Sequence, residues 1–246
     1  MKLSIIIPAY NEAKRIAGTI ETICVFLERK HLYSELILVN DGSTDDTLQI
    51  IKAYCDPNDM IKIISYNKNR GKGYAVRSGV LSATGDILLF LDADLSTAIE
   101  ETESFLDEID NYDVLIGSRR LKNSNIIKKQ PFYRVFLGRL FSLFVDSIFH
   151  FDIEDTQCGY KMFKREPARN IFENLKIEKF SFDVEVLYLA SKFNYRIKQL
   201  PVTWHNDADS SIYAVKDGMK MLLDLIKIKR NHSFDKNAQI FINIPV

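Results

Sequence analysis

The sequence predicts an α/β protein in which a mostly parallel sheet carries helices on both faces. Short apolar runs alternate with stretches of helical periodicity through the first half of the chain, a pattern typical of strand–helix–strand units. Acidic residues closely follow the apolar runs in three places, at Glu12, Asp41 and Asp92. Because the carboxyl ends of parallel strands meet at one edge, where open α/β sheets bind ligands, the sequence also predicts a binding site there.

The expected elements of the first half follow one another in a regular order: strand 3–7, helix 12–29, strand 35–39, helix 45–55, strand 61–65, helix 73–83 and strand 86–91. Asn11 is a suitable cap for the first helix, whose apolar residues at helical spacing are Ile16, Ile20, Ile23 and Leu27. A further helix near 99–109 leads to a strand at 114–117. The pattern then changes, so a seam is expected near 123–125.

Length and composition exclude several classes of protein. A chain of 246 residues with 46% hydrophobic content suits one large α/β domain, or a domain with an appendage. The four histidines lack ligand spacing and are interpreted as surface or packing residues, not as a zinc site. The three cysteines are also unpatterned, which fits reduced thiols in a cytosolic protein. Cys158 is interpreted as a packed small side chain and not as a nucleophile.

The paired acids Asp92 and Asp94 are the most informative motif. They follow the apolar run 87–91, and two hard oxygen ligands at this spacing suit Mg²⁺ or Mn²⁺ holding a diphosphate. In an isolated pair, one acid capping the next helix while the other is solvated explains the spacing equally well. Three acidic strand ends on one edge need balancing cations, which a metal and the basic segment 67–73 supply. The sequence therefore predicts a metal-dependent nucleotide site.

The second half of the chain is locally basic and apolar. Residues 114–145 contain seven basic side chains and no acidic one, although the formal net charge of the chain is zero. As a helix, residues 132–151 suit a segment lying on an anionic membrane, and burial against the domain explains them equally well. Residues 219–229 are a second candidate for a helix that lies on a membrane. Residues 231–246 are interpreted as a tail with a short strand at 239–244. No apolar run fits a signal peptide or approaches the roughly 20 residues that span a bilayer.

Motifs in both halves resemble those of one enzyme family. The first-half motifs 5–12, 40–45, 71–73 and 92–94 resemble family 2 glycosyltransferases, which have the GT-A, Rossmann-like fold. The second-half motifs are similar to those of the dolichyl-phosphate β-glucosyltransferases: Gly117-Ser118-Arg119, the run 155–163, Phe182-Asp183-Val184-Glu185 and Pro201-Val202-Thr203-Trp204. The resemblance covers roughly residues 3–230. The Asp-Thr-Gln-Cys-Gly run at 155–159 is its most specific part.

The resemblance implies a single GT-A domain at 1–230. Residues 1–122 are the expected nucleotide-sugar-binding half, and residues 123–230 the acceptor half, with C-terminal helices that face the acceptor and the membrane. An amphipathic interfacial helix is expected at about 130–151, followed by a C-terminal tail at 231–246.

Site residues are assigned from the motifs and the expected chemistry. Asp94 is expected to bind the metal, and Asp92 to bind either the ribose or the metal through water. The expected nucleotide-binding residues are Pro8, Ala9, Tyr10, Glu12, Asp41, Arg70, Lys72, Asp92 and Ala93. For Arg70 and Lys72, ordinary loop solvation is the alternative.

The acceptor decides which residues are catalytic. A lipid phosphate is already largely dianionic, with a second pKa of about 6, and needs charged donors, for which Arg119 and Arg134 are the candidates. A sugar hydroxyl needs a base, which by resemblance is Asp155. Gln157 and Lys161 are expected to orient the acceptor or sugar. Arg134 has an alternative as a snorkelling surface residue.

A second acidic pair has two interpretations. Asp183 and Glu185 lie two residues apart at an expected helix start, where capping and contact with the helix dipole explain them at least as well as sugar binding.

The expected activity is inverting transfer of a hexose, most simply glucose from UDP-glucose, to a polyprenyl or dolichyl phosphate. The enzyme is expected to be cytoplasmic and peripheral at the cytoplasmic face of a membrane, with Mg²⁺ or Mn²⁺ as cofactor and no nucleic-acid partner. Mannosyl transfer from GDP-mannose and hexosyl transfer to a soluble glycan are the alternatives. A nucleotide-binding module without turnover is disfavoured, because both acids of the metal pair and the basic stretch are present.

Overall fold

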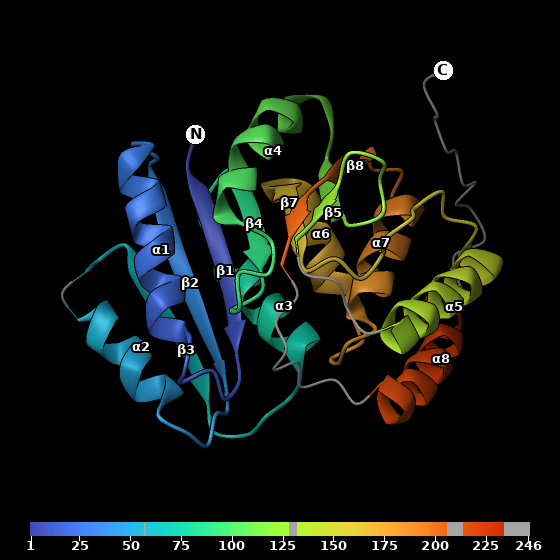
Figure 1. Ribbon diagram of the computed structural model, residues 1–246, viewed down its shortest axis with the longest axis horizontal. Coiled ribbons are helices and arrows are strands. Elements are labelled where there is room, and N and C mark those ends of the chain that lie inside the picture. Colours follow the sequence, from blue (N-terminus) through green and yellow to red (C-terminus); the bar gives the residue numbers. More distant parts are fainter. Residues whose placement is uncertain (57, 128–131, 206–213, 234–246) are drawn as a thin grey trace.

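Strands rich in Ile, Leu and Val form the centre of the protein. The computed structural model describes residues 1–56, 58–127, 132–205 and 214–233, apart from the side chains of residues 132–134, 136–137, 214–217 and 219. Nearly all side chains of the inner strands are buried, as in a parallel sheet covered on both faces. Figure 1 shows this sheet between helices.

Seven strands of the described residues form one sheet, in the spatial order β3, β2, β1, β4, β7, β5 and β8. In chain order these strands are β1 (Leu3–Ala9), β2 (Ser34–Asp41), β3 (Ile61–Tyr66), β4 (Ile87–Leu91), β5 (Val114–Ser118), β7 (Tyr160–Lys164) and β8 (Ile197–Pro201). Only β7 runs antiparallel to its neighbours, β4 and β5, among these seven described strands. The predicted mostly parallel α/β sheet is therefore confirmed.

Helices cover both faces of the sheet (Figure 1). One face packs against α1 (Ile16–Arg29), α2 (Thr47–Cys55) and α4 (Thr102–Glu108), and two 3₁₀ turns, Ile99–Glu101 and Ile109–Asn111, flank α4. The other face packs against α3 (Lys72–Ser82), α6 (Arg165–Asn174) and α7 (Phe182–Lys192). Two short strands, β6 (Asn125–Ile126) and β9 (Thr203–Trp204), pair separately beyond the carboxyl end of β5.

Two features of the first helix differ from the prediction. It begins at Ile16 instead of residue 12, and Asn11 does not cap it. Asn11 adopts a left-handed backbone, with φ of 57°, and its side-chain oxygen accepts a hydrogen bond of 2.8 Å from the Thr44 backbone N–H. Asn11 therefore joins the loop after β1 to the loop after β2.

The second half contains elements that were not predicted, namely β7, α6 and β8. Because β7 inserts between β4 and β5, the sheet continues across the expected seam near residues 123–125. The expected strand at 239–244 lies outside the described residues.

The remaining helices, α5 (Phe132–Phe149) and α8 (Ala214–Asn231), lie side by side at one end of the molecule (Figure 1). In α5, Val145 and Phe149 are buried in the core, whereas Leu143 is 67% exposed. The helix is therefore partly buried against the domain, as one of the two interpretations predicts, and the predicted membrane contact stays a prediction. No helix within the described part of the chain combines the length and apolarity that crossing a bilayer requires.

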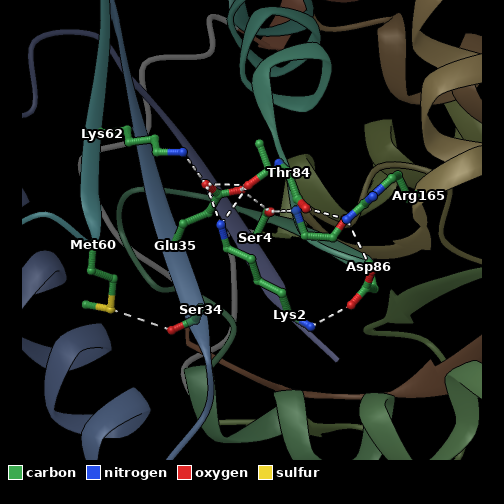
Figure 2. Close-up of polar contacts among 10 residues, drawn as sticks. Lys2, Ser4, Ser34, Glu35, Met60, Lys62, Thr84, Asp86 and Arg165 are labelled. Atoms are coloured by element: carbon green, nitrogen blue, oxygen red, sulfur yellow. Dashed lines mark hydrogen bonds and ion pairs between the residues drawn. The ribbon is translucent and has the colours of Figure 1, made fainter.

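The buried carboxylate of Glu35 connects neighbouring strands at the edge of the sheet opposite the acidic strand ends. Glu35 is 2% exposed and accepts hydrogen bonds of 2.6 Å from the Ser4 hydroxyl, the Thr84 backbone N–H and the Lys62 ammonium. Figure 2 shows these contacts and those of Lys2, which lies 3.1 Å from the same carboxylate. They join β1, β2, β3 and the turn before β4.

Candidate active site

The carboxyl ends of β1, β2, β4 and β5 surround a cavity of about 490 Å³. It lies at the edge where the sequence placed the site. The predicted residues that line it are Pro8, Ala9, Tyr10, Glu12, Asp41, Lys72, Asp92, Ala93, Asp94, Arg119 and Gln157. Arg70, Asp155 and Lys161 are not among the lining residues, and the Arg134 side chain lies outside the described residues.

Asp92 is held in place from two sides. Its Oδ1 lies 2.6 Å from the Lys72 Nζ, at the first residue of α3. Gly159 packs so closely against the same carboxylate that a Cβ there would overlap it, which explains the glycine of the Asp-Thr-Gln-Cys-Gly run. Burial disfavours the charge on Lys72, but Asp92 and Asp183 outweigh it and raise the pKa of Lys72.

Asp94 also lines the cavity. Its Oδ1 accepts a hydrogen bond of 2.9 Å from the Ser96 backbone N–H, and the next helical turn begins only at Ile99, so Asp94 does not cap a helix. Burial and the neighbouring Asp92 raise the pKa of Asp94. Burial also raises the pKa of Glu12, against the opposing effect of Arg15, its ion-pair partner, and both Asp94 and Asp92 add to this rise. Negative charge on Asp92 therefore disfavours the ionised forms of both Asp94 and Glu12.

The donor set at Asp92 and Asp94 fits a divalent cation that arrives with a ligand. Within the described residues, no group of three or more His, Cys, Asp or Glu side chains is arranged to hold a metal. Mg²⁺ is commonly bound by one or two carboxylates together with substrate phosphates, and both acids line the cavity. The two carboxylates therefore suit a cation that takes its other ligands from a diphosphate and water.

Asp41 organises the loop before α3. Its carboxylate accepts hydrogen bonds of 2.8 Å from the Arg70 and Gly71 backbone N–H groups and from the Asn69 side-chain amide. The Arg70 guanidinium points elsewhere, since it pairs with Glu178 and lies 3.6 Å from the centre of the Tyr74 ring. The prediction that both Arg70 and Lys72 bind the nucleotide therefore needs correction, because Lys72 reaches the cavity and Arg70 does not.

Asp155 is a buried partner of Arg119. Arg119 Nε and Nη2 donate hydrogen bonds of 2.6 and 2.8 Å to the two carboxylate oxygens, and the Arg119 backbone N–H donates a third of 3.1 Å. Burial raises the pKa of Asp155, but Arg119 outweighs it and lowers that pKa to about 2. An inaccessible carboxylate of this pKa is a poor general base at neutral pH. The geometry instead favours a role for Asp155 in positioning Arg119.

Lys161 is fully buried and does not reach the cavity, contrary to the prediction. Its Nζ pairs with Asp183 and donates a hydrogen bond of 2.6 Å to the Cys158 carbonyl. Asp183 does line the cavity, so Lys161 is connected to the site through this aspartate.

Glu185, the second acid of the pair that begins with Asp183, is not among the cavity-lining residues. It accepts hydrogen bonds from the Lys176 and Ile177 backbone N–H groups, at 3.0 and 2.6 Å, and contacts His232. Both acids lie in the first turn of α7, as the helix-dipole interpretation predicts, but no side-chain hydrogen bond caps this helix. The sequence therefore did not separate the two: Asp183 faces the cavity and Glu185 does not.

Sequence reasoning missed one wall of the cavity. The lining residues without a predicted role include Lys179 and Phe180 before α7, Trp204 on β9, and Lys220, Met221 and Asp224 on α8. Trp204 lay within a quoted motif, but its role was unassigned. No spacing in the sequence brings α8 over the strand ends, because its position depends on packing against α5 and the core.

The sequence of this chain is similar to those of known proteins. A family model described as glycosyl transferase family 2 matches residues 4–172. A dolichyl-phosphate beta-glucosyltransferase of Dictyostelium discoideum is 36% identical over 240 residues, covering 92% of this chain and 73% of that protein. The protein of the same name from Saccharomyces cerevisiae is 35% identical over 246 residues, covering 92% and 74%.

Solved structures share the fold at lower identity. A complex of glucosyl-3-phosphoglycerate synthase from Mycobacterium tuberculosis with Mn²⁺, UDP and phosphoglyceric acid has a TM-score of 0.67 at 16% identity, covering 96% of this chain and 80% of that chain. Mannosyl-3-phosphoglycerate synthase from Rubrobacter xylanophilus has a TM-score of 0.66 at 16% identity, covering 98% and 78%. These similarities confirm the predicted GT-A fold.

Proposed function

Because the chain belongs to glycosyl transferase family 2, we propose that it transfers glucose from UDP-glucose to a polyprenyl phosphate of the dolichyl type. The names of its curated relatives support both the sugar and the lipid phosphate. The observation that carries the proposal is the position of Arg119. This arginine lines the same cavity as the paired acids and is held there by a buried aspartate.

The reaction requires two phosphate groups to be held near one anomeric carbon. The bond from that carbon to the donor diphosphate breaks, and its electron pair leaves with the diphosphate. An oxygen of the acceptor phosphate forms the new bond from the opposite side, which inverts the configuration. The phosphate is already largely dianionic at neutral pH, so no residue has to remove a proton. The buried, ionised state of Asp155 is compatible with this chemistry.

The chain's own residues divide between donor and acceptor. Asp94 and Asp92 would hold a divalent cation, Mg²⁺ or Mn²⁺, which when bound neutralises charge on the leaving diphosphate. Asp41, through the loop 69–71, shapes the nucleotide end of the cavity. Arg119 binds the acceptor phosphate, with Arg134 as its proposed second donor.

We also propose that α5 and α8 contact the cytoplasmic face of a membrane, so that the protein is peripheral there. Their exposed apolar side chains are Val135, Leu140, Leu143, Phe144, Leu223 and Ile226. Exposed basic side chains on the same helices are Arg139, Lys220, Lys227, Lys229 and Arg230. Apolar contact plus attraction to anionic lipids is the combination that binds interfacial helices. Lys220 also lines the cavity, which supports entry of the lipid phosphate from this side.

A donor and acceptor screen tests the proposal. Purified protein is incubated with UDP-glucose or GDP-mannose, with Mg²⁺ or Mn²⁺, and with a short-chain polyprenyl phosphate or a soluble oligosaccharide. We expect a glucosylated lipid phosphate from UDP-glucose. Transfer to the oligosaccharide alone, or mannosyl transfer alone, would contradict the proposal.

A further inference from the structure

Trp204 lies in the cavity wall next to Arg119. It is the single tryptophan of the chain, lines the cavity and is 8% exposed. The proposed activity so far gives it no role. Its contacts indicate one.

The backbone around Trp204 joins two loops of the site. Trp204 forms an isolated β-bridge with Thr97, and the next residue, His205, donates a backbone hydrogen bond of 2.7 Å to the Ser96 carbonyl. Ser96 is also the residue whose N–H binds Asp94. On the other side, the Val202 N–H donates a hydrogen bond of 3.3 Å to the Ser118 carbonyl, directly before Arg119. The segment 202–205 therefore connects the loop after Asp94 with the end of β5.

The Trp204 ring also contacts Arg119 directly. The guanidinium carbon lies 5.4 Å from the ring centre, within the range of a cation–π interaction. Asp155 occupies Nε and Nη2 of the same guanidinium, and among the described residues Nη1 has no hydrogen-bond partner. The ion pair and the ring thus fix Arg119 from two directions and leave one nitrogen for a ligand.

We propose that Trp204 is a positioning residue that orients Arg119 toward the acceptor phosphate and couples this arginine to the loop that carries Asp94. The inference rests on the proposed function, because it assigns the phosphate on Arg119 to the acceptor. Trp204 itself does not touch the reacting atoms. Its effect passes through Arg119.

Tryptophan fluorescence provides a direct test, because all of it comes from Trp204. Titration with a short-chain polyprenyl phosphate, in Mg²⁺ and UDP, should change the emission of the wild type saturably. The Arg119→Ala variant should lose this response. Lys122→Ala is the matched control, since Lys122 is an exposed basic residue just after Arg119, and it should respond like the wild type.

Kinetics of substituted proteins test whether Trp204 influences acceptor binding through Arg119. Trp204→Leu should raise the KM for the polyprenyl phosphate about tenfold, and Trp204→Phe by about threefold or less, because a phenyl ring retains part of the cation–π interaction. The KM for UDP-glucose should change less than about twofold. In an Arg119→Ala background, Trp204→Leu should add no further rise in acceptor KM, since contacting residues are not additive. Thermal unfolding of each variant identifies any general loss of structure.

The outcomes separate this inference from the proposed function. If the wild type glucosylates the polyprenyl phosphate while its fluorescence is unresponsive and Trp204→Leu keeps the wild-type acceptor KM, the positioning role is wrong and the function stands. Equal effects of Trp204→Leu with and without Arg119 would also overturn the role. If the wild type does not use the polyprenyl phosphate at all, the proposed function fails, and this inference fails with it.

Discussion

Asp94 lines the cavity with Asp92 and is the residue proposed to hold the cation, and burial and Asp92 both raise its pKa. Asp94→Asn should reduce transfer at least about 1000-fold, since leaving-group stabilisation by a metal is worth several kcal/mol. The fold should persist, because the substitution also removes like-charge repulsion. Transfer rates and thermal unfolding of the purified variant check both points. Normal turnover of this variant in EDTA would contradict a metal role.

Asp155 differs from Asp94 in having a cationic partner. Its pKa of about 2 means that it stays ionised from about pH 5 to pH 9, so the pH profile of transfer should show no titration of this group. Asp155→Asn should raise the acceptor KM, because Arg119 loses its ion pair, and should leave the KM for UDP-glucose near that of the wild type. A loss confined to kcat, with an altered pH profile, would instead support a general base.

Among the secondary-structure elements, α5 and α8 carry the proposed membrane contact. Leu143→Glu should weaken binding to liposomes that contain anionic lipid, because it places charge on the exposed apolar face of α5. Binding of the wild type should fall with salt, since each nearby basic residue contributes about 1 kcal/mol that ions screen. Val25→Glu on α1 is the control: Val25 is 62% exposed, against 67% for Leu143, and should not affect binding. Sedimentation with liposomes measures both, and equal behaviour of the two variants would exclude the α5 surface.

Some secondary-structure elements could be predicted from sequence patterns alone, and others could not. The strands of the first half are apolar runs bounded by loops, and their acidic ends met at one edge because parallel strands share it. β7 was missed because a lysine, Lys161, interrupts it at a fully buried position. That burial depends on Asp183, which is distant in the sequence. Likewise, no local pattern predicts that α8 reaches the cavity.

The stability of the whole molecule should depend on the Glu35 cluster at the far edge of the sheet. Burial alone raises the pKa of Glu35, but Lys62, Ser4 and Thr84 outweigh it and hold that pKa well below its usual range. The contribution of ionised Glu35 to the free energy of unfolding is therefore present at neutral pH. It is lost as the pH falls below about 4.5, the pKa of this group in an unfolded chain, toward its lower pKa in the folded protein. Glu35→Gln should lower the free energy of unfolding by about 1–3 kcal/mol at pH 7 and flatten its acid dependence. Urea unfolding at several pH values measures this, and a parallel acid dependence in both proteins would assign it to other carboxylates.

The central claim is that this glycosyltransferase places its sugar on a phosphate held by arginine. The most direct measurement compares Arg119→Ala and Arg134→Ala with the wild type, using UDP-glucose and a polyprenyl phosphate. Both variants should lose most acceptor use, because charge-assisted contacts to the phosphate vanish, while slow hydrolysis of UDP-glucose by water persists. Intact transfer to the polyprenyl phosphate in both variants would contradict the claim.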